Sequence, residues 1–130
     1  MQKMPEIPEK LKYTENHEWV SIEDDKTIRY GITDFAQSEL GDIVYVELPE
    51  VGENVEIGEM IGAVESVKTV SDLYAPLSGT IVKVNEELED SSEIINEDPY
   101  GDGWIAVIEI SDRSELDSLI SAEEYKMLID

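Results

Sequence analysis

Short runs in which apolar and polar residues alternate occupy most of the chain, and this pattern is typical of β-strands that bury one face. Residues 17–22 (HEWVSI) and 27–32 (TIRYGI) combine aromatic and β-branched side chains, and an acidic turn separates them. We therefore predict that both are strands. The start of the chain differs, because Pro5 and Pro8 lie there among charged residues. We predict that residues 1–12 form a flexible arm.

Two strand-like segments recur later in the chain. Residues 41–46 (GDIVYV) resemble 79–84 (GTIVKV), and residues 60–65 (MIGAVE) resemble 104–109 (WIAVIE). A polar loop at 96–103 makes the second copy longer. Two copies of one strand–loop–strand unit can bury their apolar faces against each other. The repeat predicts a mainly β sandwich with a quasi-twofold axis, although chance similarity between short strands would give the same pattern.

Two segments have helical patterns. Residues 33–41 (TDFAQSELG) begin with a Thr-Asp pair that would cap a short helix and end with a glycine that would stop it. At the C-terminus, the sequences DRSE at 112–115 and SAEE at 121–124 match capping boxes, and each is followed by apolar residues at helical spacing. We predict two short helices within 112–129, whose apolar stripes cover the core.

Length and charge limit the possible functions. A chain of 130 residues is long enough for one domain with a substantial core, and we assign residues 13–130 to it. The formal net charge of −23 argues against nucleic acid or an anionic membrane as a partner, because both would repel the protein. The charge is compatible with docking to basic patches on other proteins, and equally with a role in solubility alone.

The chain has no cysteine, so it cannot form a disulfide, a thiolate metal site or a thiol nucleophile. Any redox group must therefore be brought in. No apolar run approaches the ~18 residues of a membrane span, and no signal peptide is visible. We expect a cytoplasmic location.

One lysine is isolated in an acidic, strand-like region. Lys68 lies in the sequence ESVKTVSD, and the nearest basic residues are Arg29 before it and Lys83 after it. Lys68 follows the last strand of the first copy, where a sandwich would have a surface hairpin. An ordinary solvated turn lysine explains this position, since a lone ammonium in a core costs several kcal/mol unless it is paired.

The sequence around Lys68 resembles the lipoylation segment of the H protein family of the glycine cleavage system. The matching segment is GAVESVKTVSDLYAP at 62–76, and only the first dozen residues lie outside the likeness. The other matching segments are 17–20, 31–36, 40–44, 96–104 and the C-terminal helices.

The resemblance implies a lipoyl-domain-like barrel-sandwich hybrid, with an attachment hairpin at about 60–80 whose Lys68 amine carries lipoic acid in amide linkage. It also implies a non-catalytic shuttle with no catalytic residues of its own. The shuttle would take an aminomethyl group from a pyridoxal-phosphate glycine decarboxylase to an aminomethyltransferase. A dihydrolipoyl dehydrogenase would reoxidise the arm, and a lipoate-attaching enzyme would install it.

The resemblance also points to residues around the arm. Glu18 and Asp72 would hold the cationic cargo, with Asn16 beside them, where related proteins often carry another small polar residue. Glu65 and Asp72 flank the lysine, and the attaching enzyme would read them, although both also suit a solvated turn. His17 is the only histidine, and a structural hydrogen bond near Trp19 explains it better than acid–base catalysis.

Other functions fit the sequence less well or remain open. A biotin carrier would place its lysine between methionines, and lipoyl domains of 2-oxoacid dehydrogenases usually have Asp-Lys-Ala at this turn, whereas Val67 and Thr69 flank Lys68. A lipoate depot of the same family and an unmodified structural or adaptor sandwich remain open. We expect no metal site, because the acidic segment 86–102 lacks the spacing of a calcium loop.

Overall fold

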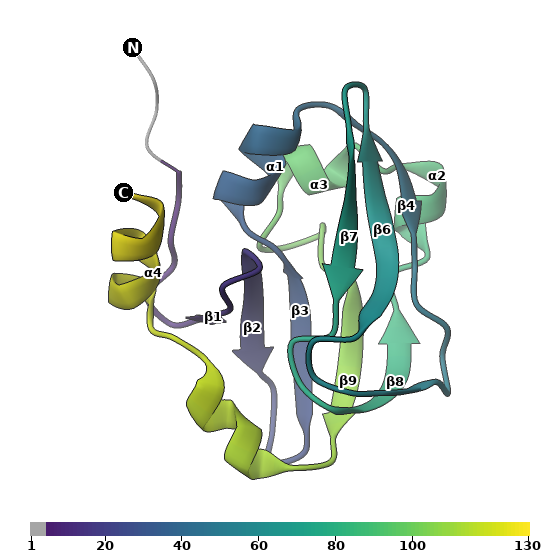
Figure 1. Cartoon of the computed structure of the whole chain (residues 1–130). Helices are drawn as coiled ribbons and strands as arrows, with labels where there is room; N and C mark the ends of the chain where they lie inside the picture. The colour runs from purple at the N-terminus through teal and green to yellow at the C-terminus, as the bar shows by residue number, and fades with distance from the viewer. Residues whose placement is uncertain (1–4) are drawn as a thin grey trace.

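The protein is a sandwich of two antiparallel β-sheets, seen in a computed structural model that describes residues 5–130 (Figure 1). The larger sheet has the strand order β1-β2-β3-β9-β8-β5 and the smaller has the order β4-β6-β7. The strands of the larger sheet are β1 (Lys12–Tyr13), β2 (Glu18–Ile22), β3 (Thr27–Ile32), β9 (Ala106–Ile110), β8 (Gly79–Val84) and β5 (Asn54–Val55). Those of the smaller are β4 (Ile43–Glu47), β6 (Met60–Ser66) and β7 (Val70–Tyr74). The predicted mainly β architecture is confirmed.

The internal repeat is confirmed at the level of strand pairing. The first copy forms the pair β4–β6 in the smaller sheet, and the second forms β8–β9 in the larger sheet. Both ladders shift register at equivalent places, between Ile43 and Tyr45 in β4 and between Ile81 and Lys83 in β8. Strands that resemble each other only by chance in composition would not be expected to have bulges at equivalent positions. The matching register shifts therefore support a true repeat. The two copies are therefore structurally equivalent.

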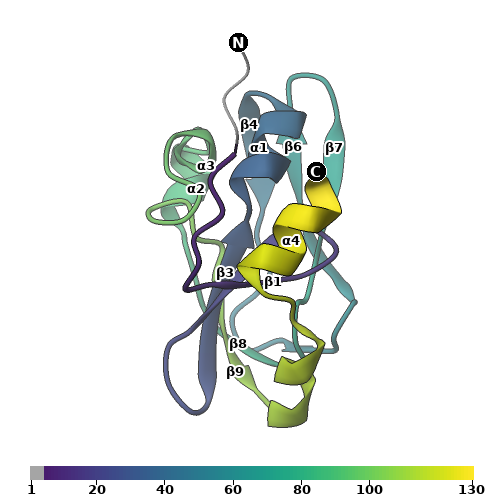
Figure 2. The same cartoon turned by 90° about the vertical axis from the view of Figure 1, so that its left-hand side faces the viewer.

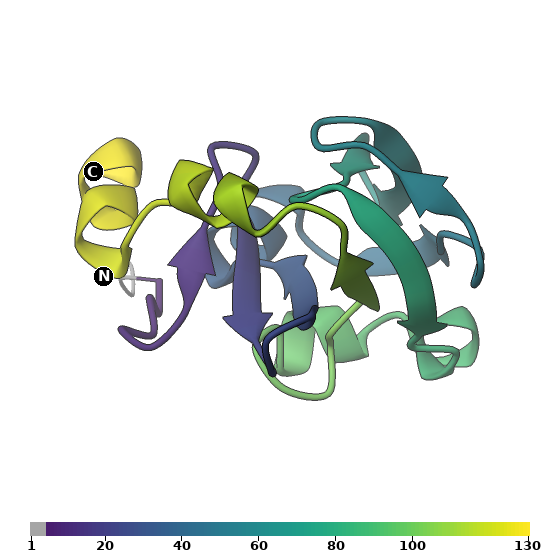
Figure 3. The same ribbon diagram turned by 90° about the horizontal axis from the view of Figure 1, so that it is seen from below.

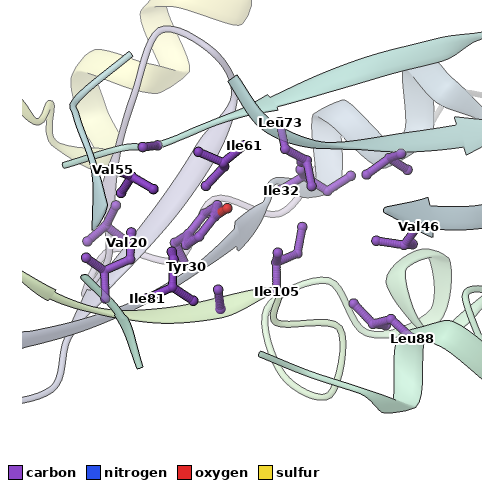
Figure 4. Close-up of a cluster of buried hydrophobic side chains, with 14 of the residues drawn as sticks. Val20, Tyr30, Ile32, Val46, Val55, Ile61, Leu73, Ile81, Leu88 and Ile105 are labelled. Carbon is purple, nitrogen blue, oxygen red and sulfur yellow. The ribbon is translucent and has the colours of Figure 1, made fainter. Parts of the chain in front are cut away.

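The core lies between the two sheets, and both contribute fully buried side chains (Figure 4). The period-two alternation places Ile81 of β8 inside at 0% exposure and leaves its neighbour Val82 41% exposed. The smaller sheet contributes Val64 and Leu73 to the same cluster. A second cluster, which contains Tyr13, Trp19, Ala122 and Tyr125, lies under the C-terminal helix.

The helix predicted at 33–41 is α1 (Asp34–Leu40). Its N-cap is Thr33, whose side chain accepts a hydrogen bond from the Ala36 amide, and it ends at Gly41, which has a φ of 84°. Two further helices, α2 (Glu87–Asp90) and α3 (Ile94–Glu97), were not predicted, because a single turn has no readable periodicity. Each buries one apolar side chain, Leu88 or Ile95.

The two C-terminal helices differ in how they begin. The predicted capping box of α4 (Ala122–Ile129) is present between Ser121 and Glu124. The box predicted at Asp112 is only half present: Asp112 is the N-cap and accepts from the Ser114 amide, but the Glu115 carboxylate accepts hydrogen bonds from the amide and hydroxyl of Ser78 instead. This segment forms a 3-10 helix, η1 (Arg113–Ser118), which lies across the lower end of the molecule (Figure 3).

The predicted flexible arm is described only from residue 5 onward, and residues 1–4 lie outside the described part. Residues 5–12 run alongside α4 (Figure 2). The Tyr100 hydroxyl donates to the Glu6 carbonyl at 2.6 Å, and the Tyr13 hydroxyl donates to the Pro8 carbonyl at 2.6 Å. The mobility of this segment in solution stays a prediction. Within residues 5–130, no helix is both long and apolar enough to cross a membrane.

The alternation of buried and exposed side chains along β8 predicts how substitutions there change the free energy of unfolding. We expect Ile81→Ala to lower the free energy of unfolding by about 2–5 kcal/mol, because it leaves a cavity between the sheets. The control Val82→Ala, on the opposite face of the same strand, should cost less than about 1 kcal/mol. Chemical denaturation of both variants measures the difference. Equal losses would contradict the assigned core face of β8.

Candidate functional site

Lys68 lies in the tight turn that joins β6 to β7, at the tip of a hairpin that projects beside α1 (Figure 1). The last ladder pair is Glu65 with Val70. Beyond it, the Ser66 amide donates to the Thr69 carbonyl at 2.8 Å. The Ser66 hydroxyl also donates to that carbonyl and accepts from the amides of Lys68 and Thr69 at 3.3 and 3.1 Å. Because one buried serine closes the turn, the backbone that carries Lys68 is held in one place.

The Lys68 side chain is exposed and makes no ion pair within residues 5–130. The turn also rests on the start of β4, because the Val67 amide donates to the Asp42 carbonyl at 3.0 Å. A Cβ built on Gly41 would lie 3.6 Å from Lys68 Cε, so the lysine stem passes close to the end of α1. The amine is therefore displayed at a bend, as the sequence predicted.

A cleft of about 280 Å³ opens between α1, β7 and the turn before β2. We call it the α1 cleft. It is lined by Asn16, His17, Glu18, Ile32, Phe35, Ala36, Glu39, Leu40, Val64, Ser71, Asp72 and Leu73. Asn16, Glu18 and Asp72, which the family resemblance placed around the arm, are thus brought together in one cleft. Glu65 is not among them and is exposed on β6, near the hairpin tip.

Glu18 is the buried acid of this cleft, with 2% of its surface exposed. Its Oε1 accepts from the Thr14 hydroxyl at 3.0 Å, and its Oε2 accepts from the Tyr74 amide at 3.1 Å. Because Glu18 begins β2 and Tyr74 ends β7, the carboxyl joins the two sheets. Burial raises the pKa of Glu18 to about 8, and the two hydrogen bonds oppose this shift only in part.

Other acidic and polar groups of the cleft are closer to solvent. Asp72 and Asn16 are exposed. Sequence reasoning missed Glu39 and Phe35, which line the cleft from α1. Their i, i+4 spacing places both on one face of the helix, so the helical pattern could have indicated them once the cleft side of α1 was known.

His17 has a structural hydrogen bond, as predicted, and its partner Tyr125 packs in the same cluster as Trp19. Its Nδ1 lies 2.8 Å from the Tyr125 hydroxyl of α4, whereas Trp19 Nε1 donates to the Pro99 carbonyl at 2.8 Å. Burial lowers the pKa of His17, and the nearby Glu39 carboxylate opposes that shift. Within residues 5–130, no three His, Cys, Asp or Glu side chains are grouped to hold a metal ion.

The raised pKa of Glu18 predicts a pH dependence of stability. The unfolded chain ionises this carboxyl near its ordinary pKa of 4.5, whereas the folded chain keeps the proton up to about pH 8. Between these values the folded state binds more protons, so this group makes stability fall as pH rises, by up to about 1.4 kcal/mol per pH unit.

Glu18→Gln should remove this contribution, because an amide does not titrate. Denaturation from about pH 5 to pH 8 should then show wild type losing stability relative to Glu18→Gln as pH rises. The exposed Glu15→Gln serves as the control and should follow wild type. A constant difference between wild type and Glu18→Gln across this range would mean that Glu18 is ionised in the folded protein.

Comparison with known proteins points to one family. The family model described as "Glycine cleavage H-protein" matches residues 11–130. The chain is 62% identical over 126 residues to the glycine cleavage system H protein of Halalkalibacterium halodurans, covering 97% of this chain and 98% of that protein. It is 59% identical over 123 residues to the H protein of Coprothermobacter proteolyticus, covering 95% and 97%.

A solved structure supports the same assignment. The crystal structure of the H protein from Mycobacterium marinum superposes with a TM-score of 0.83 at 45% sequence identity, covering 93% of this chain and 97% of that one. The lipoyl-domain-like barrel-sandwich fold is thus confirmed. The H protein is a carrier component of the glycine cleavage system and not one of its catalysts. The chain belongs to the glycine cleavage H-protein family.

Proposed function

We propose that the chain is lipoylated at Lys68 and shuttles an aminomethyl group from the pyridoxal-phosphate glycine decarboxylase to the aminomethyltransferase. The reduced arm would then go to dihydrolipoyl dehydrogenase, and the work would take place in the cytoplasm. The observation that carries this proposal is the exposed, unpaired Lys68 amine on a rigid turn next to the α1 cleft. When attached, the lipoyl group supplies the disulfide chemistry that a chain without cysteine lacks.

Lys68 fits the attachment of this group for two reasons. Its amine is in solvent, so an attaching enzyme can reach it, and no carboxylate in residues 5–130 pairs with it. The turn holds its backbone, so an enzyme meets one conformation of the hairpin. A tether on Lys68 also makes delivery within a docked complex intramolecular, with an effective concentration on the order of mM. We propose that the attaching enzyme reads the exposed carboxylates of Glu65 and Asp72 beside it.

The α1 cleft suits a cationic amine. An ammonium about 4 Å from a carboxylate gains about 4 kcal/mol at the effective dielectric of a protein surface. Ionising Glu18 at pH 7 costs only about 1.4 kcal/mol, because its pKa of about 8 lies one unit higher. The attraction exceeds this cost, so Glu18 would release its proton when the cation enters. Asp72 would supply a second carboxylate at the cleft, with the Asn16 side chain as an additional hydrogen-bonding group.

The apolar lining of the cleft would keep water from the cargo. Phe35, Leu40 and Leu73 line the cleft together with the acidic groups. A dry, fixed environment strengthens the ion pair and slows hydrolysis of a reactive cargo. The chain would thus protect the cargo between enzymes without catalysing a step itself.

The attachment site can be tested by intact-mass measurement of the protein from its native cell. We expect one added lipoyl group in wild type, its loss in Lys68→Arg, and its retention in Lys83→Arg, a matched change at another exposed lysine. An unmodified native pool would leave only the adaptor function. Glycine–bicarbonate exchange with the purified partner enzymes then separates the shuttle from the lipoate depot, which would not support exchange.

The cleft can be tested by following release of the aminomethyl group from loaded protein. We expect Glu18→Gln combined with Asp72→Asn to speed release by tenfold or more, since two carboxylates at about 1 kcal/mol or more each are lost. Glu65→Gln removes a carboxylate from the same hairpin but outside the cleft, and should release at the wild-type rate. Unchanged release in the double variant would show that these carboxylates do not hold the cargo.

A further inference from the structure

We propose that Tyr125 of the C-terminal helix is a positioning residue, whose hydroxyl fixes the two walls of the α1 cleft relative to each other. The role of the cleft in this inference rests on the proposed function. Tyr125 is fully buried. Its hydroxyl lies 2.8 Å from Thr33 Oγ1 and 2.8 Å from His17 Nδ1, and these two residues belong to opposite walls.

The first wall is the turn before β2. His17 lies between the cleft residues Asn16 and Glu18 and has a φ of 64°, the only positive value outside glycine in the described chain. A left-handed backbone at a residue other than glycine is strained and persists only when its surroundings hold it. The Thr33 amide holds the His17 carbonyl at 3.0 Å, and the Tyr125 hydroxyl holds the ring. Without that hydroxyl, the ring would have one fewer contact to keep it in place.

The second wall is α1, which carries Phe35 and Glu39 into the cleft. Its start is fixed by Thr33, whose Oγ1 accepts from the Ala36 amide at 3.1 Å. That hydroxyl also has one proton to donate, and the Tyr125 oxygen lies in reach. The N-cap of α1 is therefore coupled to the C-terminal helix through a single atom.

The proton order of this chain of groups is self-consistent. Burial lowers the pKa of His17, which favours a neutral ring, and burial raises the pKa of Tyr125 to about 12, which keeps its hydroxyl protonated. One order that satisfies both contacts has Thr33 donating to Tyr125 and Tyr125 donating to Nδ1 of His17. In this order the hydroxyls of Thr33 and Tyr125 each donate and accept, so neither of the two is left unpaired.

Packing remote from the cleft sets the position of the hydroxyl. The Tyr125 ring stacks on Tyr13 with centroids 4.7 Å apart and planes inclined by 7°. The capping box at Ser121 and Glu124 fixes the start of α4, which lies across β1 near α1 (Figure 2). Helix α4, which lies more than fifty residues after Lys68 in the sequence, thus helps to position the walls of the cleft.

The chain offers a matched pair of variants for the test. Tyr125→Phe and Tyr13→Phe each remove one tyrosyl hydroxyl from the same ring stack, but the Tyr13 hydroxyl binds the Pro8 carbonyl away from the cleft. Amide hydrogen exchange in unlipoylated protein would report on the walls, at Glu18 for the turn and at Ala36 for α1. Release of the aminomethyl group from lipoylated protein, which yields the free thiol, formaldehyde and ammonium with one water consumed, would report on the cleft.

We expect Tyr125→Phe to speed hydrogen exchange at both amides and to raise the rate of aminomethyl release by up to about tenfold. A rate change of this size corresponds to the loss of one hydrogen bond. Tyr13→Phe should leave all three rates at the wild-type level. Wild-type rates in Tyr125→Phe, or equal acceleration by Tyr13→Phe, would overturn the proposal.

A second variant keeps the test decisive if Tyr125→Phe does not fold. His17→Asn removes the ring acceptor while retaining a residue that tolerates positive φ, and it should speed exchange at Glu18 and release while leaving exchange at Ala36 unchanged. Wild-type exchange at Glu18 in this variant would contradict the proposal. If wild-type protein releases its cargo as fast as free lipoamide does, the proposed function of the cleft fails, whereas amide exchange still decides the role of Tyr125.

Discussion

The buried carboxyl of Glu18 is the contact on which the arrangement of the site depends. Glu18 is the first residue of β2 in the larger sheet. Its carboxyl accepts a hydrogen bond from the amide of Tyr74, at the end of β7 in the smaller sheet. The same strand β7 begins directly after the turn that carries Lys68. Removing this carboxyl from water costs free energy, and its raised pKa has the same cause, the loss of solvation of the charged form. The fold therefore carries a costly polar group between its sheets, and the proposed cationic cargo would offset that cost.

The two ends of the site have different physical demands. In the proposed function enzymes must reach the lysine, and a turn closed by the Ser66 hydroxyl holds its backbone while its side chain stays exposed. The cleft would have to shield the proposed cargo from water, and α1 and the turn before β2 form two of its walls. Tyr125 links these two walls from behind. The C-terminal helix thus has a role beyond the core cover that its apolar stripe indicates.

Much of this arrangement was readable from the sequence, and the exceptions have physical reasons. Alternation gave the longer strands and the repeat, and the caps gave α1 and α4, because these signals are local. The two-residue strands β1 and β5 were missed, since they are too short to show alternation. The one-turn helices α2 and α3 were missed since neither is long enough to show a period. The capping box at Asp112 is only half present because Glu115 found a partner in Ser78, 37 residues away. The Tyr125–His17 contact joins residues 108 apart, and no sequence pattern carries such a pairing. The roles of Glu18, Asp72 and Asn16 came from family resemblance, not from local pattern.

The most direct test of the account is a carbon NMR titration of the Glu18 carboxyl in lipoylated protein, with and without the aminomethyl cargo. The account predicts a pKa of about 8 in the empty protein and a value below 7 when the cargo is loaded, because the cation stabilises the ionised carboxyl. The same titration midpoint in both states would contradict it, since the cargo would then not lie beside Glu18.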